Sequence, residues 1–407
     1  MTIEQTDAEI PTGLALTPFD PAFAANPHPA LDALREREPA HNDEFFHRLV
    51  LTRHEDIDAI LRDRTLSSDL RKSAPESFMS MFAGDADREP SILFLDPPDH
   101  TQLRGLVNKA FTPRAVERLA PRIGEIAAGL LDAIGAAHQF DLIAAFAGPL
   151  PTIVIAEMLG VDPSDRLDFK RWSDLSVQVF DPTLSDEARA DVQRASEALD
   201  AYFRRVIRER RAEPRDDLIS SLIAVEESGE RLTEDQIVTM CALLLAAGNV
   251  TTTDLIGNGL LALLRHPEQL QRLRDDPALM KNAIEEMLRY DSPVVEASRQ
   301  PLDDATIAGC PVGAGETVEL MLAAANHDPA IYPDPHAFDI GRADTHHHSF
   351  GGGIHFCLGA PLARLEAQLA FEALLARFPS IRLADEPLDY RTLPGFQGVR
   401  RLNVVVG

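Results

Sequence analysis

The stretch Phe350-Gly351-Gly352-Gly353-Ile354-His355-Phe356-Cys357-Leu358-Gly359 governs the interpretation of the whole chain. It presents one cysteine, Cys357, in a loop with four glycines, just before an apolar helical segment. Glycine permits positive φ angles and a close approach of the backbone. A lone thiolate among backbone N–H groups suits a soft metal, and haem iron is the first candidate because thiolate ligation favours O–O cleavage. A glycine-rich turn around a structural cysteine is the alternative, and Cys357 alone does not separate the two.

The composition limits the class of protein. The 407 residues are 45% hydrophobic, enough for a large core, and the formal charge of −26 argues against nucleic acid and anionic membranes as partners. Three widely spaced cysteines do not form a disulfide framework, which fits a reducing cytosol. Residues 1–20 lack a signal-peptide pattern, and no apolar run approaches the ~18 residues of a membrane span. We therefore expect a cytoplasmic protein.

The pattern of apolar residues predicts a mainly α fold with smaller β-sheets (α+β). A flexible lead-in over 1–20 is followed by a single domain over 21–407. Helical spacing predicts helices over 28–38, 54–63, 277–291 and 358–377, and β-rich runs predict strands over 45–52 and 404–406. Residues 64–90 are irregular and carry Phe78, Met79 and Phe82. That loop either covers an apolar ligand or forms a satellite packing cluster.

The longest predicted helix covers residues 233–265. Thr233 and Gln236 form a capping box at its start, and the helix is apolar on nearly every face as far as Ala247. A polar patch then runs from Gly248 to Asp254, and the glycine alone weakens a helix by about 1 kcal/mol. Such a break inside a strong element is typical of a functional site. A bend caused by threonine hydroxyls bonding back to the helix is the alternative.

Two charged pairs stand at helical spacing. His100 and Arg104 follow Asp-Pro-Pro and share a helix face, which suits a clamp on a carboxylate or an ordinary surface pair. Glu286 and Arg289 are three residues apart, and alone they indicate no more than a surface ion pair.

Together these motifs resemble the cytochrome P450 family of haem-thiolate monooxygenases, specifically its soluble bacterial class. The resemblance covers nearly the whole chain in the family's order. It rests on Phe350-Gly351-x-Gly353-x-His355-x-Cys357-x-Gly359, Glu286-x-x-Arg289, Ala247-Gly248-x-x-Thr251-Thr252 and His100-x-x-x-Arg104. It implies the cytochrome P450 fold, with haem b between the long central helix and the helix after the cysteine loop.

The resemblance also implies roles for single residues. Cys357 is the expected iron ligand, with Phe350, Gly351 and Gly359 beside it in the loop. The expected partners of the haem propionates are His100, Arg104, Arg299 and His355. Glu286, Arg289 and Arg342 match the family's buried structural triad. The expected distal residues are Gly248, Asn249, Val250, Thr251, Thr252 and Asp254.

The substrate pocket is expected to draw on the segments 66–95, 165–185, 240–252, 293–298 and 394–398. The side chains proposed to line it are mostly apolar: Phe78, Met79, Phe82, Phe180, Leu244, Ala247, Val294, Val295 and Phe396. They predict a small to medium hydrophobic substrate.

The implied reaction places one oxygen atom from O2 into a C–H or C=C bond of that substrate. The haem domain uses all 407 residues, so electrons must come from a separate ferredoxin and reductase, ultimately from NAD(P)H. Arg104, Lys109, Arg114 and Arg364 are candidates for docking an acidic ferredoxin, or they are a solvated basic surface. We expect a monomer.

The chain departs from the family at Val250, where an acid usually precedes the alcohol Thr251. A valine cannot relay a proton. Asn249 with waters, protons supplied by Asp254, or a slow, uncoupled or unusual reaction remain open, as does simple packing of Val250 against substrate or a neighbouring helix. Our hypothesis is a functional but altered relay.

Two readings of another class remain. One is a haem or small-molecule binder without catalysis, or a peroxide-driven oxidase. The other is a zinc protein built on His346, His347, His348, His355 and Cys357, although three adjacent histidines cannot all point one way.

Overall fold

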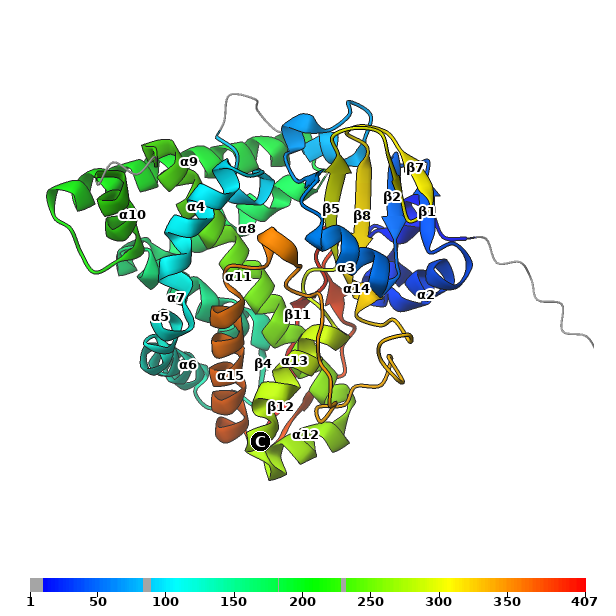
Figure 1. Cartoon of the computed structure of the whole chain (residues 1–407). Helices are drawn as coiled ribbons and strands as arrows, with labels where there is room; N and C mark the ends of the chain where they lie inside the picture. The colour runs from blue at the N-terminus through cyan, green and yellow to red at the C-terminus, as the bar shows by residue number, and fades with distance from the viewer. Residues whose placement is uncertain (1–9, 83–88, 182, 228–231) are drawn as a thin grey trace, which may run out of the picture.

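The structure is a computed structural model, and it describes residues 10–82, 89–181, 183–227 and 232–407. Figure 1 shows most of the helices on one side and a five-stranded sheet on the other. The long helix α11 (Glu234–Arg265) runs through the middle, and α15 (Ala360–Arg377) packs against it. This agrees with the predicted mainly helical fold with smaller sheets.

The remaining helices surround these two. They are α1 (Pro21–Ala25), α2 (His28–Arg37), α3 (His54–Arg62), α4 (Asp99–Val107), α5 (Pro113–Glu117), α6 (Ala120–Ile134), α7 (Pro149–Met158), α8 (Arg166–Ser176), α9 (Asp186–Ala212), α10 (Leu218–Glu227), α12 (Pro267–Asp275), α13 (Met280–Tyr290) and α14 (Leu322–Ala325). Short 3-10 turns used below are η1 (Gly13–Leu16), η3 (Phe78–Phe82), η8 (Val177–Phe180) and η10 (Gly353–His355).

The largest sheet has the order β1-β2-β8-β5-β3, and its strands come from both ends of the chain. These strands are β1 (Ala40–Asp43), β2 (Arg48–Leu51), β8 (Thr317–Met321), β5 (Glu296–Pro301) and β3 (Leu66–Ser67). Only β2 and β8 pair in parallel within this sheet. The smaller sheets are β4-β12-β9, β10-β11 and β6-β7, formed by β4 (Gln139–Asp141), β12 (Asn403–Val406), β9 (Ile381–Leu383), β10 (Asp389–Tyr390), β11 (Val399–Arg401), β6 (Ala305–Ile307) and β7 (Cys310–Val312).

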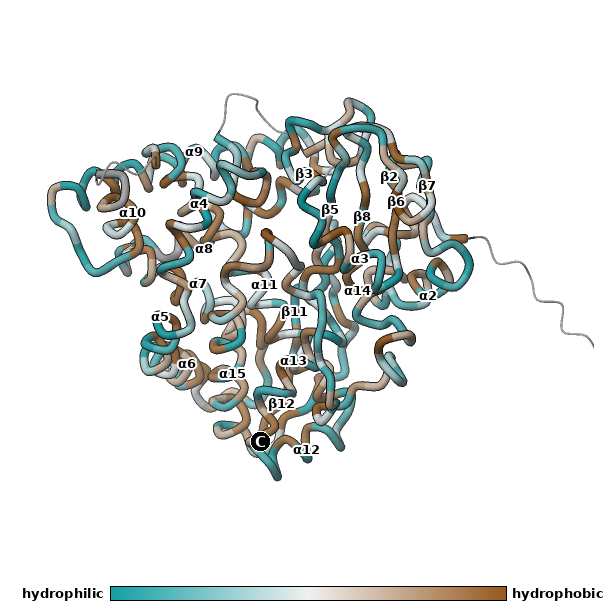
Figure 2. Tube along the Cα trace, in the orientation of Figure 1, coloured by the Kyte–Doolittle hydropathy of each residue, from teal (hydrophilic) through white to brown (hydrophobic). Residues whose placement is uncertain are grey.

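Helix α11 is the core of the helical half. Its capping box forms as predicted, with Thr233 and Gln236 exchanging side-chain bonds with each other's backbone N–H groups. The helix contacts α7, α9, α13 and α15. Of the helices in the described ranges, it alone is long and apolar enough to cross a bilayer, and burial explains its apolarity. In Figure 2 its hydrophobic stretch lies inside the molecule, while the outer loops are largely hydrophilic.

Two local predictions are wrong. The flexible lead-in over 1–20 does not hold for its second part, because η1 packs there and Leu16 is fully buried. Residues 1–9 lie outside the described residues. The strand predicted over 45–52 begins only at Arg48, because residues 44–47 form the turn between β1 and β2, where His47 has a φ of 48°.

Candidate functional site

The cysteine loop is held open by glycines at two positions. Gly351 and Gly353 have φ angles of 66° and 62°, which disfavour other residues. At Gly353 a Cβ atom would also lie 2.0 Å from the Leu61 carbonyl oxygen, so the loop meets the end of α3 backbone to backbone. The Cys357 N–H donates to the Phe350 carbonyl (2.9 Å), closing the loop just before α15.

The surroundings of Cys357 act on its thiol in two directions. Burial raises the pKa of the Cys357 thiol, while the N–H groups of Gly359 and Ala360 and the charge of Arg104 oppose that rise. These donors stabilise a sulfur that carries negative charge. A Cβ at Gly359 would lie 4.0 Å from Sγ, so glycine also leaves that side of the sulfur clear.

Three basic side chains from three elements gather beside this loop, where they can carry positive charge. His100 lies on α4, Arg299 on β5 and His355 on η10, and the rings of the two histidines have centroids 4.3 Å apart. Burial lowers the pKa of Arg299 to about 10. Burial, followed by the charges of Arg299 and His100, lowers the pKa of His355 to about 3. Positive charge on these side chains therefore costs free energy, unless an anion binds beside them.

This cationic cluster (His100, Arg299 and His355) has unfilled hydrogen-bonding capacity. Neither ring nitrogen of His100 has a partner among the described residues, although His100 is buried. The nearby carboxylate of Asp96 already accepts from Lys72 and from Ser67. A buried unpaired cation is costly, so the cluster fits a ligand that brings carboxylates. The two propionates of haem, with the iron near Cys357, meet this requirement.

Arg104 lies at the rim of the cluster. Its guanidinium donates to the Phe356 carbonyl and to the Asn108 side chain (3.0 Å to Oδ1). Burial lowers its pKa, and the negative charge available at Cys357 opposes that change.

Glu286, Arg289 and Arg342 come together as a buried ion-pair triad. Arg289 bonds both oxygens of Glu286 (2.8 and 2.9 Å), and Arg342 Nε bonds the same carboxylate (3.1 Å to Oε2). Glu286 and Arg289 are fully buried. The remaining donors of the two arginines reach backbone carbonyls of residues 326–337. The triad thus anchors the segment that leads to the cysteine loop.

On α11, one stripe stays open in the middle of a mostly buried helix. Ala247 is exposed, and Leu243 and Thr251, four residues before and after it, are half-buried. The Thr251 hydroxyl donates to the Ala247 carbonyl (2.7 Å), so its oxygen still accepts. Thr252 is buried on another face. The stripe lies in the part of α11 where the sequence predicts the distal residues, and Thr251 is its polar group.

Asn249 and Asp254 are engaged in other contacts. Asn249 accepts from Thr152 on α7 (2.8 Å) and donates to Ser173 on α8 (2.8 Å). Asp254 accepts from Arg391 (3.0 Å), and burial raises its pKa to about 6. At Gly248 a Cβ atom would lie 3.7 Å from Ile155, an ordinary van der Waals distance, so packing alone does not require a glycine there. The contacts therefore argue against Asn249 or Asp254 as a substitute for the acid missing at Val250.

Val250 sits in an apolar cluster that joins three of the expected substrate segments. It is buried with Val177 and Leu393, and Phe396 packs against them. Val250 therefore packs against neighbouring segments, one of the alternatives left open by the sequence.

Several residues expected to line the pocket lie elsewhere. Phe78 packs on Phe46, with the Arg48 guanidinium 4.7 Å from its ring centroid, so it belongs to the packing of the large sheet. Val295 is buried with the N-terminal helices, because side chains alternate along an extended segment and its neighbour Val294 faces the opposite way. Leu244 is buried in the helical core, so the open stripe passes through Leu243.

The remaining pocket residues are placed only in part. Met79 donates its N–H to Thr317, and Phe82 stacks edge-on against Phe78, so η3 lies along the sheet. Val294 and Phe396 form a β-bridge. The side chain of Phe180 lies outside the described residues.

Two alternatives from the sequence do not assemble. The histidines of the zinc hypothesis diverge, because His347 contacts Glu285, His348 contacts His54 and His355 stacks on His100. In the docking set, Arg364 is bound to Glu285 (2.6 Å) and lies over the Phe350 ring, so it is not an available surface charge. Lys109 and Arg114 are exposed.

Sequence reasoning missed the partners that fix the distal helix. Thr152 and Ser173 hold Asn249, and Arg391 holds Asp254, although these residues are 76 to 137 positions apart. No local pattern signals such pairs. The one available hint was the presence of polar residues in a buried helix, which require partners.

Comparison with known proteins agrees with this geometry. A sequence profile described as cytochrome P450 matches residues 164–393. Cytochrome P450 107B1 of Saccharopolyspora erythraea is 43% identical to this chain, over 95% of each. The chain belongs to the cytochrome P450 family. A vitamin D(3) 25-hydroxylase of Pseudonocardia autotrophica is also 43% identical, over 96% of each chain. The crystal structure of P450BioI with hexadec-9Z-enoic acid ligated acyl carrier protein superposes with a TM-score of 0.87 at 38% identity, covering 95% of this chain and 100% of that one.

As a member of this family the chain is a haem protein and a cytochrome P450 monooxygenase. The family's cofactor carries two carboxylates, the kind of group that suits the cationic cluster. The resemblance drawn from the motifs is thereby confirmed, as is the fold.

Proposed function

We propose that this cytochrome P450 binds haem b through Cys357 and inserts one oxygen atom from O2 into a C–H or C=C bond of a small to medium hydrophobic substrate. Electrons come from NAD(P)H through a separate ferredoxin and its reductase. The observation that carries the proposal is the cationic cluster beside the thiol loop, which has no free carboxylate partner among the described residues.

Bound there, the haem supplies dioxygen activation, and the chain supplies its surroundings. Cys357 provides the thiolate, and the N–H groups of Gly359 and Ala360 temper its charge. His100, Arg299 and His355 hold the propionates. Thr251 offers the hydroxyl oxygen on the open stripe of α11, where it orients a water that carries protons in.

The substrate is proposed to lie against Ala247 and the apolar cluster of Val177, Val250 and Leu393. Apolar side chains there orient a hydrophobic molecule by burial and exclude bulk water from the reacting bond. The 43%-identical vitamin D(3) 25-hydroxylase is named for a hydrophobic substrate, which agrees with this class.

Reduction is proposed to occur on the face that carries Lys109 and Arg114. Both side chains are exposed near α4 and α5. An acidic ferredoxin would be attracted there despite the acidic total charge of the chain. Arg104 and Arg364 contribute to the sulfur's surroundings instead.

The test is the spectrum of the reduced holoprotein under carbon monoxide. We expect the Soret shift of thiolate-ligated haem in the native chain, its loss in Cys357→Ser and its retention in Cys310→Ser, a matched control at a half-buried cysteine in β7. Product should form from NAD(P)H only with ferredoxin and reductase present. An unshifted Soret band in the native chain would refute the ligand assignment, and equal turnover from NAD(P)H with the ferredoxin and reductase left out would refute the electron route.

A further inference from the structure

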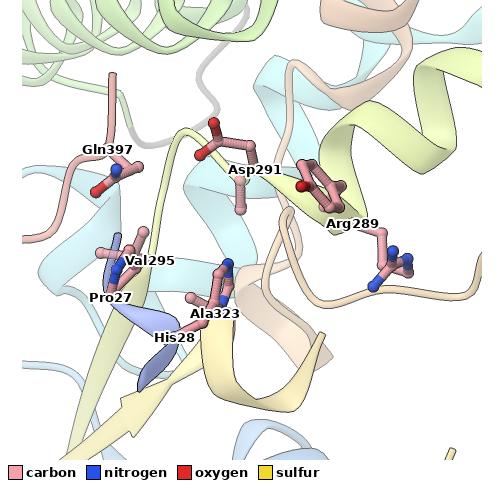
Figure 3. A pocket seen from close by; sticks show the side chains of 9 residues that line it. Pro27, His28, Arg289, Asp291, Val295, Ala323 and Gln397 are labelled. Atoms are coloured by element: carbon pink, nitrogen blue, oxygen red, sulfur yellow. The ribbon is translucent and has the colours of Figure 1, made fainter. Parts of the chain in front are cut away.

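Three histidines from distant parts of the chain meet away from the haem site. His28 begins α2, His327 follows α14, and His336 lies in the loop before the cysteine segment. One ring nitrogen from each lies within 4.8 Å of the others. Figure 3 shows His28 beside the small cavity, of about 10 Å³, that Arg289 and Asp291 also line.

The hydrogen bonds around this cluster determine which nitrogens carry protons. His327 Nε2 lies 3.0 Å from the Tyr290 carbonyl, which can only accept, so Nε2 bears the hydrogen. His336 Nε2 lies 2.8 Å from the Asp32 carboxylate and donates in the same way. In the neutral rings both Nδ1 atoms are then bare, yet they face each other at 3.2 Å. Two lone pairs at that distance need either a proton or a metal ion between them.

The third histidine adds to this unmet requirement. His28 is stacked on His327 with ring centroids 3.7 Å apart, and its Nδ1 is buried without a hydrogen-bond partner among the described residues. Two nitrogens on one tetrahedral Zn²⁺ are about 3.3 Å apart, given Zn–N distances of about 2.0–2.1 Å. The pair of His327 and His336 already has this spacing, and rotation of the His28 ring completes the set.

The surroundings are those of a metal site. A carboxylate on the outer nitrogen of His336 and a carbonyl on that of His327 orient ligand rings in metalloproteins. Nearby Arg289 shares the Glu286 carboxylate with Arg342, so its charge is offset only in part. His336 is exposed and gives an ion an entry path, whereas His327 is fully buried.

We propose that His28, His327 and His336 form a structural site for a divalent transition metal of the zinc class, with solvent as the fourth ligand. Imidazole nitrogens select such ions over Mg²⁺ or Ca²⁺. The metal ties the N-terminal helix α2 to the segment 326–337. Arg289 bonds the carbonyls of Asn326 and Pro335, the residues just before two of the ligands, so metal and triad brace the same segment.

The test uses the haem-loaded protein after dialysis against a chelator. Zn²⁺ binding is measured by equilibrium dialysis with elemental analysis, with Mg²⁺ as a negative control. We expect one equivalent of zinc with a shell of nitrogen or oxygen atoms near 2.0–2.1 Å in zinc-edge X-ray absorption. His336→Ala, at an exposed position, should weaken binding at least tenfold and abolish any zinc-dependent rise in Tm.

The matched control is His138→Ala, which removes another exposed histidine and should change zinc affinity less than twofold. His28→Asn should weaken binding as His336→Ala does. Equal affinity in the native chain and His336→Ala would overturn the proposal. So would a sulfur shell near 2.3 Å, because it would place the ion on a cysteine.

Discussion

Two buried polar groups built on arginine behave in opposite ways in this cytochrome P450. In the triad of Glu286, Arg289 and Arg342, the shared carboxylate and backbone carbonyls satisfy the two arginines. In the cationic cluster of His100, Arg299 and His355, burial lowers the pKa of all three side chains, and no free carboxylate among the described residues balances the charge of Arg299.

The difference separates a structural role from a ligand-binding role. A buried charge that has its partner stabilises the fold only while the partner stays, and its removal is costly. A buried charge without a partner weakens the fold until a ligand supplies one. Breaking the triad is therefore expected to lower the stability of the fold, whereas removing the charge of Arg299 is expected to leave the stability of the apoprotein unchanged or raise it.

The largest effect is expected from Glu286→Gln. Losing the carboxylate charge leaves Arg289 and Arg342 buried without compensation, which should cost about 3–5 kcal/mol of unfolding free energy. Denaturant unfolding of the holoprotein, followed by circular dichroism, measures it. The control is Glu125→Gln, which breaks an exposed pair with Arg122 and should cost at most about 1 kcal/mol. Similar losses in both variants would contradict the triad's role.

The next effect is expected at Arg299. Arg299→Leu removes a charge-assisted bond to a haem carboxylate, worth about 1.5–3 kcal/mol, so haem should be lost about tenfold to a hundredfold faster. Transfer of haem to a scavenging apoglobin reports this rate. The apoprotein should be as stable as the native one or more so, because an uncompensated charge has gone.

Arg299→Lys is the conservative control, since it keeps the charge and should retain haem better than the leucine variant. A large loss of apoprotein stability in Arg299→Leu, with haem retention unchanged, would move Arg299 to the structural side of the comparison.

The sequence predicts the features that depend on nearby residues and misses those that depend on contacts between distant elements. The cysteine loop, the capping box of α11 and the spacing of Glu286 and Arg289 depend on residues that are close in the sequence, so the sequence alone predicts them. The roles of Val295 and Leu244 failed because one residue of shift along a strand or helix turns a side chain to another face. The partners of Asn249 depend on how α7 and α8 pack, which no spacing in the sequence encodes.

The third prediction concerns Val250, an apolar residue where the family favours an acid. Val250→Asp would place a carboxylate among Val177 and Leu393, at a cost of about 1–3 kcal/mol. We expect a lower unfolding midpoint and no gain in coupling between NAD(P)H use and product. Val250→Thr, of nearly equal volume, is the control and should lose less stability. Improved coupling in the aspartate variant with an unchanged midpoint would show that an acid at this position can relay protons.

The smallest effect is expected at Asp254, which lies between the two extremes. One oxygen accepts from Arg391, while the other is buried without a partner among the described residues. Burial raises the pKa of Asp254 from 3.8 to about 6. The folded state thus holds this proton at a pH where the unfolded chain has released it, and stability falls as pH rises from about 4 to 6, by about 1.4 kcal/mol per pH unit. Above pH 6 the loss is complete.

Asp254→Asn removes this titration while keeping the shape of the side chain. Unfolding free energies of both proteins at pH 5, 6 and 7 should therefore diverge by about 1 kcal/mol between pH 5 and 6 and then run parallel. Asp291, whose pKa burial raises to about 7, titrates in both proteins, and the Asp254 charge adds to that rise, so its titration cancels only in part. A constant difference across this range would mean that Arg391 holds Asp254 fully ionised. The two residues would then be a compensated buried ion pair, like the triad.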